Sequence, residues 1–476
     1  MPFELGLKNE LIVSCPRHGH TTRLLLVVCI IIGCGPKHGD QKKIPIAPAQ
    51  SGDFLSQTNN DFAFLEEMQR VAYYNKAAFP SFGEDWQKIL SEDFLNRIAD
   101  VGKKTKEQRE QARNELREQI RKLPERRLPT RLENPATYFL VSAVNNHIFD
   151  ATKAIGYQLP TIIIGTLPTR SANARSVPSP SGGRIIVLNT GLFNAVNRFV
   201  KALAPVIKIM NSGNMIELGV SLQLSRHLAR PQSDVFIRFL DVGLEYLQLS
   251  SGEDYMLPGE YLQFHYQMVT AVESFVLAHE YAHAILSHNT EKGDSKALGS
   301  SLANDRWMEP EQALHAWIQE LEADRLGTKI MLSSVSLNKS VAPEIMAAAP
   351  DIALQLIDYL DNARLMYESG EAMAVKPAMD SPEMSLYTVA QNCIQRKKSV
   401  NCLLPEQLQS VHRFSDHPPG SLRRDSIRAF CKEEGLFYEE KNRIDIGSAF
   451  AELIQLMWPN TVRVYAEVRR RKPPVK

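Results

Sequence analysis

Hydrophobic residues along the chain recur mostly at the three- and four-residue spacing of α-helices. The longest such run covers residues 266–288, which contain few helix breakers and enough apolar side chains for a buried helix. A second run at 310–332 starts with a proline in its first turn, as helices often do. Further helical patterns cover residues 191–210, 233–250, 343–368, 421–433 and 445–457.

Two short stretches have the composition of β-strands, TIIIG at 161–165 and RIIVLN at 184–189. The residues between them are rich in Ser, Pro and Gly and predict a loop. The region 61–155 has a helical pattern that includes a charged amphipathic helix at 107–123. The chain is therefore predicted to be mainly α with a small β-sheet (an α+β fold), and the sheet precedes the longest helix.

The N-terminus carries a short apolar run, residues 24–32, directly after Arg23. A membrane span needs about 20 apolar residues, so this shorter run is typical of a signal peptide. The run continues into Ile-Gly-Cys, which resembles a bacterial lipobox with Cys34 as the lipid-modified residue. An ordinary signal or an uncleaved anchor is the alternative. We expect a chain that is lipid-anchored in the bacterial cell envelope, at the outer membrane or on the periplasmic face.

These patterns divide the chain into five parts. They are a signal peptide at 1–34, a flexible tether at 35–60, a helical N-terminal region at 61–155, a large domain with insertions at 156–435, and a C-terminal helix and tail at 436–476. In an oxidising compartment the simplest disulfide would join Cys393 to Cys402 and leave Cys431 free.

Composition and charge indicate which classes of binding partner the chain is suited to. The 476 residues include 44% hydrophobic and 23% charged residues, which are ordinary values for a globular protein. The formal net charge is +1, and the sequence has no basic stripe with interleaved aromatic residues. We therefore expect no nucleic-acid partner.

Residues His279-Glu280-Tyr281-Ala282-His283 form an HExxH motif inside the longest predicted helix. Residues i and i+4 lie on one helix face, so the two imidazoles can converge on one metal ion. Zinc takes nitrogen and carboxylate donors in a tetrahedral array, and catalytic sites leave one position open. Two histidines and a glutamate inside a buried helix would be costly without such a partner. A third protein ligand is therefore required, and Glu280 is placed to hold the attacking water.

The third ligand separates the known classes of HExxH sites. The metzincin pattern HExxHxxGxxH fails, because Leu286 stands at the glycine position and Asn289 at the third histidine. The gluzincin pattern puts a glutamate on a following helix with an aspartate four residues later, and Glu320 and Asp324 fit it. Glu320 would bind the metal, and Asp324 would accept a hydrogen bond from a ligating histidine and fix its tautomer.

Three nearby side chains are weaker candidates for the ligand position. Glu322 points about 200° round the helix from Glu320. His288 and His315 are more simply explained as residues behind the ligands or on the surface. The predicted site holds one Zn²⁺ per chain on His279, His283 and Glu320.

Four segments resemble the gluzincin metallopeptidases that include the CAAX prenyl proteases, HtpX-like membrane proteases and BepA-like periplasmic proteases. HEYAHAILSH and QELEADRLG carry the most specific likeness. Residues 173–193 are similar to the Asn-Ala loop, edge strand and Gly-Leu turn of these proteins, and residues 416–427 to their His-Pro segment. In the relatives the Gly-Leu turn runs almost directly into the HExxH helix, whereas residues 194–265 intervene here.

The resemblance implies a zinc-dependent endopeptidase with a zincin-like core and an N-terminal helical extension, acting on protein or peptide substrates in envelope quality control. Glu280 would take the proton of the attacking water and pass it to the leaving amine. His417 would be a donor to the developing oxyanion, with Arg424 as the second candidate. His417 has two alternative roles, a cap on its own loop or a fourth ligand that blocks the metal.

Two further points stay open in the sequence. The strand 184–189 could pair with an extended substrate as an edge strand, or it could be an interior strand. The chain could also be a lipid-anchored scaffold or chaperone that keeps a metal site and cleaves little or nothing. The presence of Glu280 argues against that alternative, because a structural zinc site does not need this carboxylate.

Overall fold

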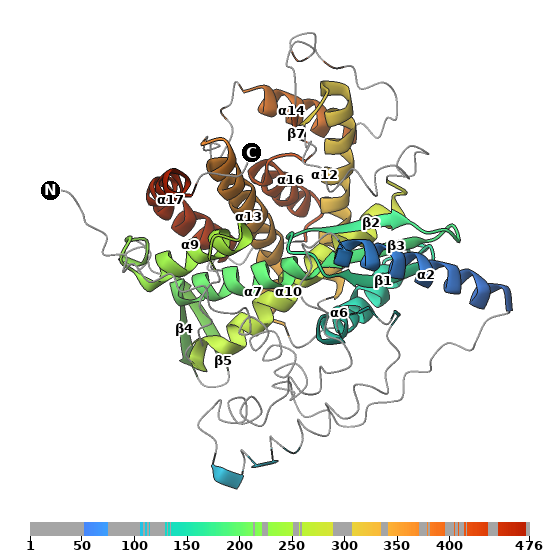
Figure 1. Ribbon diagram of the computed structural model, residues 1–476, viewed down its shortest axis with the longest axis horizontal. Coiled ribbons are helices and arrows are strands. Elements are labelled where there is room, and N and C mark those ends of the chain that lie inside the picture. Colours follow the sequence, from blue (N-terminus) through green and yellow to red (C-terminus); the bar gives the residue numbers. More distant parts are fainter. Residues whose placement is uncertain are drawn as a thin grey trace.

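The described part of the chain is mainly helical, and a small three-stranded sheet lies at one side of the helices (Figure 1). The computed structural model describes residues 52–74, 135–212, 215–220, 227–250, 259–288, 307–334, 341–370, 381–395, 414–415, 417–436 and 446–472, together with a few shorter pieces. The mainly helical fold with a small sheet confirms the prediction. The predicted signal peptide with Cys34 and most of the predicted helix 107–123 lie outside the described residues.

Strand β3 (Arg184–Asn189) lies in the middle of the sheet, between β1 (Ile162–Leu167) and β2 (Ala174–Pro178). It runs parallel to β1 and antiparallel to β2. All six residues of β3 are buried, so the interior alternative for 184–189 is correct and the edge-strand alternative is wrong.

Strand β2 (Ala174–Pro178) falls inside the stretch that was predicted to be a loop, and that prediction is wrong. Only Ser176 of its five residues is buried, and Pro178 ends the strand. A polar strand that ends in proline is typical of a sheet edge, where one side of the backbone has no strand partner. The same polar composition hides such a strand in the sequence.

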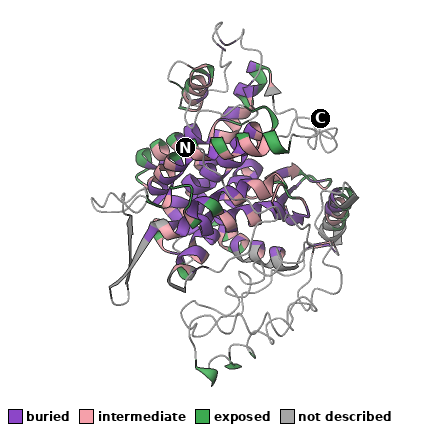
Figure 2. Cartoon of the chain, turned by 60° about the vertical axis from the view of Figure 1, so that its left-hand side comes forward, coloured by how far each residue is buried: buried purple, intermediate pink, exposed green. Residues whose placement is uncertain are grey.

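Helix α10 (Gly259–Ile285) lies at the centre of the fold and has neighbours on several sides (Figure 1). It packs against β2 and against helices α6 (Pro135–Ala154), α7 (Thr190–Leu203), α12 (Pro310–Ser333) and α13 (Pro343–Glu368). A helix that is covered on several sides needs apolar residues on several faces. Many residues of α10 accordingly belong to the main hydrophobic core. The buried residues gather in the middle of the described part of the chain (Figure 2).

The predicted helix 191–210 ends earlier than expected. Helix α7 stops at Leu203, a short 3₁₀ turn η2 (Ala204–Val206) follows, and strand β4 (Ile207–Ser212) pairs with β5 (Met215–Val220). Pro205 lies in this turn and lacks the backbone N–H that the next α-helical hydrogen bond would need, so the α-helix does not continue through it.

The remaining helices form an outer layer on α12 and α13. Helix α14 (Pro382–Gln395), which the sequence did not predict, packs on α12. Helices α9 (Asp234–Tyr246), α16 (Gly420–Glu433) and α17 (Ile446–Arg471) pack on α13. Two short strands, β6 (Trp307–Met308) and β7 (Phe414–Ser415), pair beside α12.

Helix α2 (Gly52–Tyr74) covers the face of the sheet that carries Ile163 and Ile185. Its first turns fall within the stretch 35–60 that was expected to be a tether. A polar composition disfavours burial but not helix formation, so a helix anchored by Leu65 can extend into polar residues.

The contact between α2 and the sheet includes a buried polar network. Gln69 on α2 donates hydrogen bonds to the carboxylate of Glu133 (2.7 Å) and to the carbonyl of Thr166 (2.8 Å). Glu133 also accepts a hydrogen bond from the backbone N–H of Thr166 (3.0 Å). Burial raises the pKa of Glu133 to about 7, although these hydrogen bonds oppose the shift.

Two of the cysteines considered above, Cys393 and Cys431, lie in the described part of the chain. Cys393 is disulfide-bonded, and Cys431 is buried and free. The predicted partner of Cys393, Cys402, lies outside the described residues. Among the helices of the described ranges, none has the length and apolar character that a membrane crossing requires.

Candidate metal centre

The centre lies where helix α12 packs against helix α10. Gly327 makes this approach possible: a Cβ atom there would stand 2.8 Å from the Cα and N atoms of His279. Because Glu320 lies two turns and Asp324 one turn before Gly327 on α12, the same approach brings their carboxylates to the HExxH residues.

The three predicted ligands converge. His279 Nε2 lies 3.0 Å from His283 Nε2, and the two imidazole nitrogens lie 3.5 and 3.3 Å from oxygens of Glu320. Four tetrahedral ligands at the usual zinc distances stand about 3.3 Å apart. The three residues form the only such group of potential ligands among the described residues. A buried His279, His283 and Glu320 site that can hold a metal ion is therefore present.

Asp324 lies behind the first histidine, as predicted. Its Oδ1 is 3.0 Å from His279 Nδ1, the ring nitrogen that faces away from the ligand cluster. Arg423 donates two hydrogen bonds of 2.7 Å to the same carboxylate and lies 3.2 Å from Glu320 Oε2. Asp324 is fully buried, and Arg423 neutralises its charge. Asp324 faces His279, whereas Arg423 also contacts Glu320.

Arg423 contacts the centre, whereas Arg424, the second candidate for the oxyanion donor, does not. Arg424 instead lies 3.2 Å from Asp358, a residue of α13. Neighbouring residues on a helix point about 100° apart, so only one of the two arginines can face α12 from α16. The sequence shows both arginines but not the rotation of α16 against its neighbours.

The second ligand histidine, His283, also has a side chain behind it. His283 Nδ1 is 3.0 Å from His288 Nδ1, and His288 Nε2 is 3.4 Å from Glu322 Oε2. Glu322 is thus outside the ligand group, as predicted. His315 is exposed on α12 and pairs with Gln319.

The charges around the ligands favour a cation. Burial alone would lower the pKa of His279, but the carboxylates of Asp324 and Glu320 reverse this and raise the pKa to about 10. Burial would raise the pKa of Glu320, but His417 and Arg423 hold it well below its usual range. The carboxylates that draw a proton to His279 equally favour a divalent ion at the imidazole nitrogens, so the donor set fits zinc.

Glu280 is buried beside the ligands without belonging to their group. Burial raises the pKa of its carboxyl group, and the charges of His283 and His279 oppose the shift. Arg175, on the edge strand β2, lies within electrostatic reach of Glu280. A carboxylate with a raised pKa that is not a ligand is suited to accept a proton near neutral pH.

His417 lies at the rim of the centre. Its Nε2 is 3.6 Å from Glu320 Oε1, and 48% of its side chain is exposed. Strand β7 positions this loop, because Ser415 pairs with β6 and accepts a hydrogen bond of 2.8 Å from the Trp317 indole. The structure brings His417 to the site, as predicted, but outside the group of three ligands.

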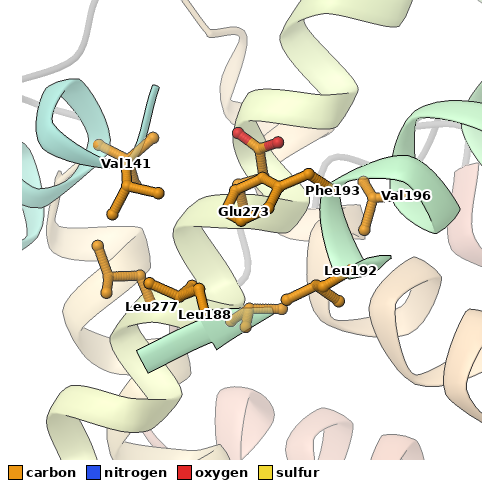
Figure 3. A pocket seen from close by; sticks show the side chains of 9 residues that line it. Val141, Leu188, Leu192, Phe193, Val196, Glu273 and Leu277 are labelled. Atoms are coloured by element: carbon orange, nitrogen blue, oxygen red, sulfur yellow. The ribbon is translucent and has the colours of Figure 1, made fainter. Parts of the chain in front are cut away.

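A small apolar cavity lies further along α10, between α6, α7 and the end of β3 (Figure 3). Glu273 is one of the residues that line the cavity (Figure 3), and burial raises the pKa of Glu273 to about 8. Burial therefore favours the neutral form of this carboxyl group. The cavity lining includes neither Glu280 nor any of the three ligands, so the cavity is separate from the metal centre.

Comparison of the chain with protein-family models, curated proteins and solved structures finds no match.

Proposed function

We propose that the protein is a zinc-dependent endopeptidase of the gluzincin type that hydrolyses peptide bonds in protein substrates. The observation that carries the proposal is the placement of Glu280, a buried carboxyl group beside three metal-ligand side chains but not among them. Metal sites with a purely structural role need no such group, whereas hydrolysis needs a proton acceptor.

The chain's own residues divide the chemistry between them. Zinc on His279, His283 and Glu320, when bound, supplies Lewis acidity toward water and toward a peptide carbonyl. Glu280 takes a proton from the attacking water and returns it to the leaving amine. His417, half-exposed at the rim, is suited to donate a hydrogen bond to the developing oxyanion.

Strand β2 is the proposed place for the substrate backbone. It lies at the edge of the sheet, packs against α10, and carries Arg175 near Glu280. An extended peptide that adds to this edge gains backbone hydrogen bonds and runs past the proton acceptor. This assigns to β2 the role that the sequence suggested for 184–189.

The proposed location is the bacterial envelope, with lipid on Cys34 as the anchor and quality control of envelope proteins as the task. The disulfide at Cys393 supports an oxidising compartment. The run 24–32 supports export, although it lies outside the described residues.

Metal removal tests the proposal directly. The full chain should cleave an unfolded protein such as casein, lose this activity on dialysis against a zinc chelator, and regain it when about one equivalent of zinc returns. Cleavage that persists at full rate without metal would reject the metallopeptidase. Zinc binding without cleavage of any unfolded substrate would favour the scaffold or chaperone alternative.

Replacement of His417 with alanine separates its possible roles. As an oxyanion donor outside the ligand group, His417 stabilises only the transition state, so we expect kcat to fall about 10²- to 10³-fold with little change in KM. His417→Gln keeps an N–H donor and should retain more activity. Steady-state kinetics on a peptide decides: raised activity in His417→Ala would indicate a blocking ligand, and unchanged kinetics a loop cap.

A further inference from the structure

His288 is held in place by its backbone at the end of the HExxH helix. Its N–H donates to the carbonyl of His283 (3.1 Å), and its own carbonyl accepts a hydrogen bond of 2.7 Å from Arg184 on β3. Ser287 turns the chain back with a φ of 55°, which is uncommon outside glycine. Only 7% of His288 is exposed. Its ring therefore has a fixed position against the second metal ligand.

The ring of His288 lies between a ligand and a carboxylate. One nitrogen, Nδ1, faces His283 Nδ1 at 3.0 Å, and the other, Nε2, faces Glu322 Oε2 at 3.4 Å. Helix α12 supplies Glu322, two residues after the ligand Glu320 and on the other side of the helix. The line Glu322, His288, His283 thus runs from the protein surface to the ligand group.

The protons along this line follow from the metal chemistry. His283 offers Nε2 to the ligand group, so its proton must sit on Nδ1. Two imidazole nitrogens at 3.0 Å need one donor and one acceptor, so Nδ1 of His288 accepts. The proton of neutral His288 then sits on Nε2, where it points at the Glu322 carboxylate.

We propose that His288 is a positioning residue for the metal ligand His283, and that Glu322 fixes the tautomer of His288 that this role requires. The inference deepens the proposed function, because it rests on the same metal site. His279 and His283 would then have different supports. His279 is supported by the carboxylate of Asp324, which is fully buried and bound by Arg423. His283 is supported by the neutral imidazole of His288, which in turn faces the 39% exposed carboxylate of Glu322.

Loss of His288 should weaken zinc binding without removing a ligand. Outer partners of ligating histidines typically contribute about 10- to 100-fold to metal affinity. His288→Phe keeps a ring of similar size but offers no acceptor, so His283 loses the contact that fixes its Nδ1–H. His288→Asn places an amide oxygen near the former Nδ1 position and should retain more of the affinity.

The test uses Zn²⁺ alone, in competition with a chelating dye, on the full chain. We expect a dissociation constant about 10- to 100-fold higher for His288→Phe, a smaller change for His288→Asn, and a loss in the same direction for Glu322→Leu. His315→Phe is the matched control, because this histidine of α12 is exposed and pairs with Gln319, away from the ligand group. It should bind zinc like the wild type.

Nitrogen-15 NMR of the histidine rings in the wild type reads the tautomers directly. We expect the proton of His283 on Nδ1 and that of His288 on Nε2 in the zinc-loaded chain. A proton on Nδ1 of His288 would overturn the proposal, and this result does not depend on how well the substituted chains fold. Zinc affinity equal to the wild type in His288→Phe would also overturn it. A wild-type chain that binds no zinc overturns the site and the inference together, whereas one that binds zinc without cleaving peptides overturns only the proposed activity.

Discussion

Replacement of Glu280 with glutamine should leave zinc bound and lower peptidase activity by about 10⁴-fold, the upper end of what a general base contributes. Glutamine has nearly the size and shape of glutamate, so the buried packing at this point of α10 is preserved. It can hold a water molecule by hydrogen bonds but cannot take up its proton. The fall should appear in kcat and in kcat/KM alike, because the lost interaction belongs to the transition state.

A matched control for this experiment lies on the same helix. Glu273 is also a buried carboxyl group, two turns before Glu280, but it lines the separate apolar cavity (Figure 3). Burial raises its pKa and so favours the neutral form, which glutamine resembles, and Glu273 is outside the metal centre. This control should cleave peptides at the wild-type rate. Near wild-type activity in Glu280→Gln itself, with zinc bound, would refute the hydrolytic mechanism.

The parts of the centre that the sequence predicted are those set by spacing within one helix. His279 and His283 share a face because they are four residues apart, and Glu320 and Asp324 do so for the same reason. The helix period fixes these relations before any tertiary contact forms. Glu322, two residues from Glu320, was excluded as a ligand on the same ground, and it lies outside the ligand group.

The parts that were missed depend on how separate elements meet. Arg423 and Arg424 are equivalent in the sequence, and only the packing of α16 against α12 and α13 selects the first for the centre. His288 reaches His283 because Ser287 adopts a positive φ, a local conformation that its sequence does not demand. The glycine at position 327 was a usable signal, since a glycine inside a helix often marks a close approach.

In the fold, too, features set by local spacing were predicted and features set by how elements meet were missed. Helices with strong periodicity, such as α12 and α13, were predicted to within two residues. Strand β2 was missed because edge strands are polar and resemble loops. The interior position of β3 was one of two alternatives, because an apolar strand of six residues can lie anywhere that both of its faces are covered.

The ligand assignment predicts the largest effect on metal content. Wild-type protein should carry about one zinc per chain, and alanine at His279, His283 or Glu320 should remove it. Each substitution deletes one of three protein donors, and two donors cannot hold the ion against competition from water and buffer. Metal analysis after gel filtration in zinc-free buffer measures the loss.

Glu320 is the most informative of the three, because its loss should spare the fold. In Glu320→Ala the buried Arg423 keeps both hydrogen bonds to Asp324, so no buried charge is left without a partner. The circular dichroism and melting temperature of this variant should therefore stay close to those of the wild type while its zinc is lost. Glu322→Ala, two residues away and outside the ligand group, should still reach one zinc per chain when zinc is in excess. Full zinc occupancy in Glu320→Ala, or its loss in Glu322→Ala at saturating zinc, would show that the third ligand has been assigned to the wrong carboxylate.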